Sequence, residues 1–423
     1  MKKTATAFCL FLLSMAALHA QVVLDTTSMS SAYQNQMFYS LANGDVKASN
    51  KFNWDLAFTA SLEDAAILAN HATGLSVYQM PAADTANWST LDTTGMSSWP
   101  MLINSDTFWR IGAFNHGENL SAFNFGWGIF NLVDYNVHAF NRLYVLALGN
   151  GSFKKLWLKE KTFTNHYIFR IANLDNSMDY TKNLDASAVA SNRNFLYYSA
   201  SGDSLADVEP AKGSWDILFQ QYMTILQIPQ PFPYLVAGAW SNPAGVSVAE
   251  VDHADFNTVA YPGAGALDTM ATEIGYDWKV FTPPTGPWVI LDSNIYFVKA
   301  MNGDIWKLHF TGFGAGPTGD VMLGKERLTT SVSNLDEQPQ SVAIYPNPAD
   351  GSSLHLLCSL SQNAEMKVVL STLQGQVVLQ QNIAGTWGLQ SYAIPTPDLS
   401  TGVYLLNIKS NGTNATLKVV VAR

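Results

Sequence analysis

Few residue groups in the 423-residue sequence have the types and spacing that catalysis requires. There is no His-Glu-x-x-His motif of a zinc hydrolase, no Gly-x-Ser-x-Gly turn of a serine hydrolase and no paired cysteine motif of a zinc site. The glycine-rich run from Gly312 to Gly319 superficially resembles a phosphate loop. A phosphate loop must lead into a helix, whereas Val321-Met322-Leu323 is typical of a strand. We expect an inter-strand loop here, and we predict no catalytic residues, no metal site and no enzyme.

The most distinctive pattern is a Trp-Asp pair that occurs twice, as Trp54-Asp55 and as Trp215-Asp216. Each pair leads into an apolar run that is typical of a strand. Strand periodicity places Trp54 on one face with Leu56 and Phe58, and Asp55 on the other face. We expect a structural role for both pairs, with the tryptophan in the core and the carboxylate accepting hydrogen bonds from a turn or from backbone amides.

The Trp-Asp pair belongs to an internal duplication, because two further signals recur after it in the same order. The corresponding positions are Trp54 and Trp215, Trp127 and Trp278, and Gly151 and Gly303. We therefore expect two copies of one fold in tandem.

Both copies are rich in strand signals, and the chain is predicted to be mainly β. The apolar runs 143–148 and 295–300 are each followed by Asn-Gly and a second alternating run, which predicts a hairpin with a type I′ turn. Helical signals are weak, and 63–70 is predicted as a short helix or a loop turn.

The two ends of the chain have a different character from its middle. Lys2 and Lys3, the apolar run 7–18 and the small residues before Gln21 predict a signal peptide over 1–20. No other segment is apolar for eighteen residues, so no transmembrane segment is expected. Cys358 is then the one cysteine left after cleavage, which excludes a disulfide within the chain and favours a buried thiol.

A polar stretch over 331–341 is predicted to be a linker. After it, residues 342–423 form short alternating strands between Gly, Asn and Pro clusters, which favours a small immunoglobulin-like β-sandwich.

The motifs of this last segment resemble the type A C-terminal sorting domain of type IX secretion substrates, which is of the Bacteroidetes type. They are Tyr345-Pro346-Asn347-Pro348, Leu373-Gln374-Gly375, Leu399-Ser400-Thr401-Gly402-Val403-Tyr404 and the final strand from Lys418. The resemblance implies that the type IX secretion machinery is a partner, that the domain is removed, and that the protein is released or attached to surface lipopolysaccharide.

The duplicated region resembles the HmuY-like family of haem-scavenging proteins in its Asn-Trp-Asp strand, its Trp-x-x-Phe segment and the hairpin that follows. This resemblance implies two β-rich HmuY-like domains, over 21–184 and 185–330. In the haem-binding members an axial histidine lies two positions after Trp-x-x-Phe, where this chain has Leu132 and Pro283. Neither side chain can bind iron, so the cofactor-binding residues are unknown and haem is a possible ligand only through another site. The remaining candidate axial ligands are His71, His116, His138, His166, His253, His309, Met80, Met223, Met270 and Met301.

The net charge of −10 and the absence of a basic cluster argue against nucleic acid or an anionic membrane as a partner. The leading hypothesis is a secreted or cell-surface, non-enzymatic binding protein for haem or another hydrophobic ligand. The alternative is a structural or adhesive surface protein that binds glycan or protein. A secreted hydrolase is the third candidate, because scattered carboxylates could converge in the folded chain.

Overall fold

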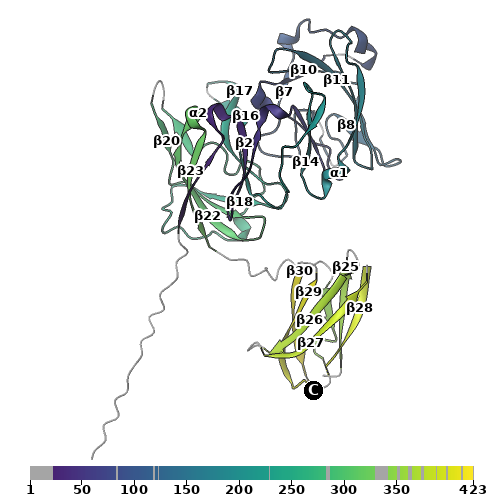
Figure 1. The fold of residues 1–423 in the computed structure, drawn as a ribbon, viewed down its shortest axis with the longest axis vertical. Coiled ribbons are helices and arrows are strands. Elements are labelled where there is room, and N and C mark those ends of the chain that lie inside the picture. The colour runs from purple at the N-terminus through teal and green to yellow at the C-terminus, as the bar shows by residue number, and fades with distance from the viewer. Residues whose placement is uncertain are drawn as a thin grey trace, which may run out of the picture. The chain divides into compact units, whose positions relative to one another are not determined.

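The computed structural model divides the chain into two compact units, residues 1–330 and 331–423 (Figure 1). It describes residues 22–328 except 82–83, 118–119, 122, 228 and 283–285, and residues 342–422 except 350–352, 361–363, 373–375, 387, 397–398 and 411–412. The predicted signal peptide, the predicted linker, Pro283 and the Leu-Gln-Gly motif at 373–375 lie outside the described residues. The model is mainly β, as predicted.

The first unit contains two lobes, and each lobe has an outer and an inner antiparallel sheet. In lobe A the outer sheet has the order β13 (Tyr180–Asp185), β12 (His166–Asn173), β11 (Phe153–Lys161), β10 (Tyr144–Ala147), β6 (Ser76–Gln79), β7 (Met101–Leu102). The short strands β8 (Gly128–Phe130) and β9 (Val137–Ala139) join it through β11. The inner sheet has the order β15 (Ser204–Ala206), β14 (Phe195–Ser199), β4 (Leu56–Thr59), β5 (Ile67–Ala69).

Lobe B repeats this arrangement. Its outer sheet has the order β1 (Val23–Ser28), β23 (Asp320–Arg327), β22 (Ile305–Phe313), β21 (Ile295–Lys299), β18 (Ser247–Val251). Its inner sheet has the order β17 (Pro231–Ser241), β16 (Ile217–Gln227), β2 (Asn35–Ser40), β3 (Gly44–Asn50). A separate hairpin pairs β19 (Lys279–Phe281) with β20 (Trp288–Ile290).

The described helices are all short. The α-helical turns are α1 (Ser187–Ala190) and α2 (Ala315–Thr318). The 3₁₀ turns are η1 (Ser31–Tyr33), η2 (Lys51–Asn53), η3 (His71–Thr73), η4 (Thr85–Thr90), η5 (Met96–Ser98) and η6 (Ala264–Ala266).

The opening strands of each repeat lie in the sheets of the other repeat. These strands are β1, β2 and β3 in the first repeat and β13, β14 and β15 in the second. β2 lies beside β16 in lobe B, whereas the equivalent strand of the second repeat, β14, lies beside β4 in lobe A. Likewise β1 pairs with β23 and β13 pairs with β12. Lobe A is therefore built from one continuous stretch, about 54–206, and lobe B from both ends of the first unit. The predicted domains 21–184 and 185–330 describe the order of the repeats along the chain, but the sheets cross that boundary.

The duplicated positions occupy equivalent places in the two lobes. Trp54 precedes β4 and Trp215 precedes β16, while Gly151 and Gly303 lie in the hairpins β10–β11 and β21–β22. The predicted hairpins are confirmed, but their turns are not of type I′. The amide of Leu148 donates to the carbonyl of Ser152 and closes a three-residue loop, in which Gly151 has a positive φ of 84°. A glycine with positive φ at the third loop position is typical of a type I turn followed by a β-bulge.

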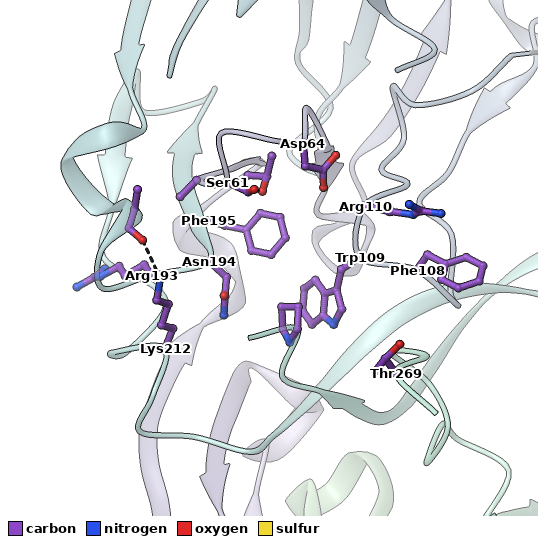
Figure 2. Close-up of a pocket in the computed structure, with 14 residues that line it drawn as sticks. Ser61, Asp64, Phe108, Trp109, Arg110, Arg193, Asn194, Phe195, Lys212 and Thr269 are labelled. Carbon is purple, nitrogen blue, oxygen red and sulfur yellow. Dashed lines mark hydrogen bonds between the residues drawn. The ribbon is translucent and has the colours of Figure 1, made fainter. Parts of the chain in front are cut away.

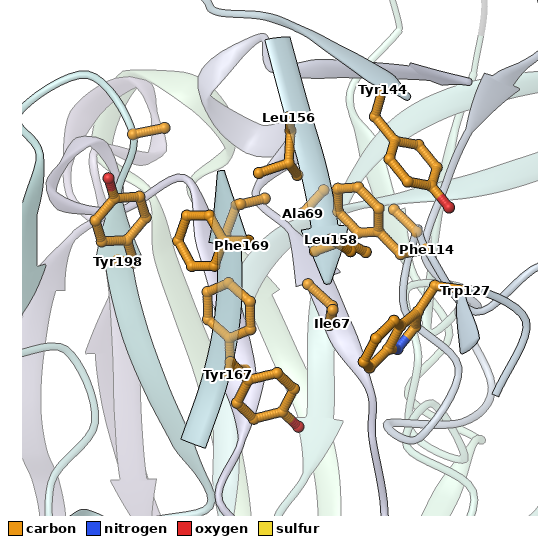
Figure 3. Packing of buried hydrophobic residues seen from close by; sticks show 14 of the residues in the cluster. Ile67, Ala69, Phe114, Trp127, Tyr144, Leu156, Leu158, Tyr167, Phe169 and Tyr198 are labelled. Atoms are coloured by element: carbon orange, nitrogen blue, oxygen red, sulfur yellow. The ribbon is translucent and has the colours of Figure 1, made fainter. Parts of the chain in front are cut away.

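The central strands of the inner sheets are buried on both faces, so the first unit is a stack of four β layers. Along β4, Leu56 and Phe58 belong to the core of lobe A, whereas Ala57 belongs to a core that lies between the inner sheets. Figure 3 shows part of the lobe A core around Phe169. β16 follows the same rule, with Leu218 between the inner sheets and its neighbours in the core of lobe B. Strands buried on both faces read as continuous apolar runs, which explains the composition of these segments.

Two local predictions are wrong. Trp54 does not share a face with Leu56 and Phe58, because the strand begins at Leu56 and Trp54 packs between the inner sheets. The predicted helix or turn over 63–70 ends in strand β5, because Ile67, Leu68 and Ala69 are buried between two layers.

The second unit is a β-sandwich, as predicted. One sheet has the order β24 (Val342–Tyr345), β25 (Ser353–Leu360), β28 (Gly388–Pro395). The other has the order β27 (Val377–Gly385), β26 (Ala364–Thr372), β29 (Gly402–Ser410), β30 (Thr413–Val421). Asn347 fastens the first motif to the final strand, since its side chain donates to the carbonyl of Lys418 and accepts from the amide of Val420. Cys358 is buried in the core, as predicted.

Candidate functional site

A groove of about 620 Å³ lies where the two lobes meet (Figure 2). Lobe A contributes the loop after β4, the loop before β14 and a long loop between β7 and β8. Lobe B contributes Lys212, Pro243 and Thr269. Ligand sites occur preferentially at such junctions, so this groove is the candidate site.

The long loop of lobe A is held against lobe B by hydrogen bonds. Trp109 donates from Nε1 to the carbonyl of Ser241 at 2.8 Å, and Thr107 accepts from the amide of Ala271 at 2.8 Å. The hydroxyl of Thr272 donates to the carbonyl of Asp106 at 2.6 Å. This anchoring gives the groove a fixed floor.

Aromatic rings form that floor. The ring of Trp109 lies 5.4 Å from that of Phe195 and 4.6 Å from that of Trp240, centroid to centroid. Phe108, beside Trp109, is 43% exposed. Phe195 and Trp240 are buried and support Trp109 from behind, so the partly exposed rings of Phe108 and Trp109 are the ones that can stack on a flat ligand ring.

Three cations surround the rings, and they differ in how they are engaged. Arg193 forms an ion pair with Asp207 at 2.5 Å, and Lys212 donates to the carbonyl of Ala190 at 2.8 Å (Figure 2). Arg110 is exposed and forms no ion pair with any of the described residues. Its guanidinium is the group best placed to bind an anion from solution.

A buried carboxylate holds the wall of the groove in place. Glu209 accepts from the amides of Asn194 and Phe195 at 2.9 and 3.1 Å, and from the side chain of Asn194 at 2.6 Å. Burial raises the pKa of Glu209 to about 7, although these hydrogen bonds act in the opposite direction.

The groove continues into a second hollow of about 470 Å³, which shares Ser61, Asp64 and Arg110 with the first. Burial raises the pKa of Asp64, while Lys161 and Arg110 lower it. Arg110 therefore lies where the two hollows adjoin. A ligand longer than one ring can occupy both hollows.

The predicted structural role of the Trp-Asp pairs is confirmed. Asp55 accepts from the amides of Ala200 and Ser201 at 2.7 and 3.1 Å. Asp216 accepts from the amides of Leu41 and Met301 at 2.7 and 2.8 Å. Both tryptophans are buried in the core between the inner sheets.

None of the predicted histidines or methionines lines either hollow of the groove. His71 is buried and contacts the carbonyl of Leu75 at 2.9 Å, and burial lowers its pKa to about 4. His309 stacks on Phe256 with ring centroids 4.1 Å apart. His71 and Met223 line one cavity of about 40 Å³ between the inner sheets, which is too small for haem. The other candidates contact separate neighbours: His116 the carbonyl of Ile103, His138 Asp134, His166 Asn183, Met80 the cluster around Trp88, Met270 Ser241 and Met301 the core of lobe B, while His253 follows β18.

Leu132, at the first position where relatives place an iron ligand, is 67% exposed in the loop between β8 and β9. Haem binding stays a prediction. The described residues contain no cluster of three or more His, Cys, Asp or Glu that could bind a metal ion. No helix in the described part of the chain has the length and apolarity needed to cross a membrane.

Sequence reasoning missed the residues of the groove. The available signal was Phe108-Trp109-Arg110, two aromatics and a cation within a loop rich in Asn, Ser and Thr. Loops on a rigid scaffold commonly carry binding residues, so this triplet could have been selected. Its partners from 190–195 and 212 are too distant in sequence to be linked to it without the fold.

Comparisons with known proteins concern mainly the second unit. Residues 343–422 match the family described as "Secretion system C-terminal sorting domain". This match confirms the predicted type IX sorting domain, and the protein is therefore a secreted or outer-membrane surface protein. The comparison with curated proteins gives no match.

Among solved structures, the chain is similar to apo PinO from Porphyromonas gingivitis, with 10% identity and a TM-score of 0.28. The similarity covers 73% of this chain and 98% of that one. A TM-score of this size supports no inference about fold or ligand, and the resemblance to the HmuY-like family stays a prediction.

Proposed function

We propose that this exported protein is a non-enzymatic surface binding protein that holds an acidic glycan in the groove between its lobes. The single observation that carries the proposal is the arrangement at Arg110. An exposed guanidinium without an ion pair among the described residues lies beside Phe108 and Trp109, where the two hollows of the groove adjoin.

The chemistry of the groove favours this ligand class over haem. Guanidinium binds a carboxylate in a planar, two-bonded geometry, and aromatic faces accept the apolar face of a sugar ring. Among the described residues that line the two hollows, none is a histidine, methionine or cysteine that could bind iron axially. The described residues of this lining also include no histidine or cysteine for the nucleophile and base pair of a peptidase or esterase.

The test is binding of the full chain to immobilised glycans that differ in whether they contain uronic acids. We expect retention on acidic glycans, and an affinity at least tenfold lower for Arg110→Glu, because a bound carboxylate would then face a like charge. Lys154→Glu in β11 makes the same change of charge away from the groove and should bind as the wild type does.

Equal loss of binding in both variants would reduce the effect to net charge and would contradict a site at Arg110. No retention on any glycan, together with a haem Soret band that persists in Arg110→Glu, would support the haem hypothesis instead.

A further inference from the structure

A second pocket, of about 220 Å³, lies in lobe B away from the groove. Five aromatic side chains form most of its wall: Tyr33, Tyr234, Tyr276, Trp288 and Phe313. Lys279 is the one charged residue among the described residues that line it. The pocket therefore combines an aromatic wall with a single positive charge.

Lys279 is built into this pocket. Its side chain is 4% exposed, and its ammonium group donates to the carbonyls of Ala237 at 2.6 Å and Tyr276 at 3.1 Å. The nitrogen lies 3.9 Å from the ring centroid of Trp278 and 4.6 Å from that of Phe313. An ammonium has three N–H bonds, so the two carbonyls leave one donor for a ligand.

The polar groups of the wall also favour a ligand with acceptor oxygens. The hydroxyl groups of Tyr33, Tyr234 and Tyr276 and the amide of Gln221 can all donate. The part of the lining that the structure describes contains no carboxylate, although the charge of Asp277 acts on Lys279 from outside the pocket. A pocket rich in donors and positive in charge selects an anion over a neutral or cationic ligand.

The rim of the pocket is apolar and exposed. Trp288 and Tyr234 line the pocket, and each contacts a phenylalanine outside the lining: Phe281 lies 5.4 Å from Trp288 and Phe232 lies 6.0 Å from Tyr234, between ring centroids. Between 37% and 51% of each of these four side chains is exposed. A planar ring placed between Trp288 and Tyr234 would remove this apolar surface from water.

The equivalent position of lobe A lacks this cation, because Gly128 follows Trp127 where Lys279 follows Trp278. A Cβ at Gly128 would lie 2.7 Å from the carbonyl oxygen of His138, so a lysine cannot be accommodated there. The cation is thus a feature that only one of the two repeats carries.

We propose that this pocket binds a small aromatic carboxylate, with the ring between Trp288 and Tyr234 and the carboxylate on the ammonium group of Lys279. This site is independent of the groove and of its glycan.

The experiment is calorimetric titration of the full chain with indole-3-acetate and with its neutral isostere indole-3-acetamide. It is run at pH 6, where Lys279 is protonated, because burial lowers its pKa only to about 7. We expect the acid to bind at least tenfold more tightly than the amide, and Lys279→Met to abolish this preference. Lys154→Met in lobe A should leave it unchanged.

Trp288→Ala is a second variant that does not disturb the buried lysine, since the Trp288 side chain is partly exposed. It should weaken binding of the acid and the amide alike, because both carry the same ring. The proposal is wrong if neither compound binds at millimolar concentration, if both bind equally to the wild type, or if Lys279→Met retains the preference for the acid.

Discussion

Asp55 and Asp216 show how equivalent residues of the two repeats are used for structure. Each carboxylate is buried and accepts hydrogen bonds from two backbone amides. These bonds replace the ones that water would supply. Lys325 in β23 has a related role. Its ammonium group donates to the carboxylate of Asp25 in β1 at 2.8 Å and so links β1 to the rest of lobe B. Such buried charges are structural because their partners use up their hydrogen-bonding capacity.

Glu209 is the buried acid whose titration should be measurable. Its pKa is about 7 in the folded protein, against 4.5 when unperturbed, so the folded state holds a proton that the unfolded state releases between these values. Stability from this group is present below pH 4.5 and is lost as the pH rises through 7.

We predict that Glu209→Gln removes this pH dependence. The unfolding free energy of the variant relative to the wild type should rise by up to about 3 kcal/mol between pH 4.5 and 7.5. Urea denaturation at a series of pH values measures it. Glu63→Gln, at an exposed position, serves as the control, and an identical pH dependence in Glu209→Gln and the wild type would contradict the assignment.

At the scale of elements, the exchange of opening strands decides how the first unit holds together. Tyr39 in β2 and Tyr198 in β14 occupy equivalent positions, and their hydroxyls donate to Asp25 and Asp203, each at 2.7 Å. Each strand thus completes a core made by the other repeat. Lobe A consequently contains all of its own strands in one stretch of chain.

We predict that fragment 54–206 folds alone, whereas fragment 54–184 does not. The shorter fragment lacks β14, which pairs with β4 and contributes the buried Leu196 and Tyr198 to the core of lobe A. Loss of two large core side chains and a central strand exceeds the stability of a small domain. Thermal melts followed by circular dichroism test this, and an equally cooperative transition in 54–184 would show that β14 is dispensable.

At the scale of the whole molecule, the export signal and the proposed binding sites lie in different units. The second unit has its own core around Leu356 and Val368, and it matches the sorting family along nearly its whole length. The groove and the aromatic pocket both lie in the first unit. Export and binding can therefore be altered independently.

We predict that deletion of residues 342–423 traps the first unit in the periplasm with its glycan binding intact. Cell fractionation and immunoblotting measure its location, and retention on acidic glycans measures its binding. Wild-type levels of the truncated protein in the medium would contradict the role of the sorting domain. Export of Arg110→Glu at wild-type levels is the matching control.

The sequence by itself determined the features that depend on local pattern. Alternation of apolar residues identified the mainly β fold, glycines at the turns identified the hairpins at Gly151 and Gly303, and recurring Trp-Asp pairs identified the duplication. The motifs of the last 82 residues identified the sorting domain. Each of these signals lies within a few residues of chain, where backbone geometry and side-chain periodicity act directly.

Only the tertiary structure decided which repeat each opening strand completes, because β2 has the same apolar pattern whether it pairs with β4 or with β16. It also decided the candidate sites. Arg110 and Lys212 line the same groove although about one hundred residues separate them in sequence. Lys279 and Tyr33 line the same pocket although about two hundred and fifty residues separate them. Groups this far apart converge only when the four β layers stack, and that stacking depends on burial summed over the whole first unit.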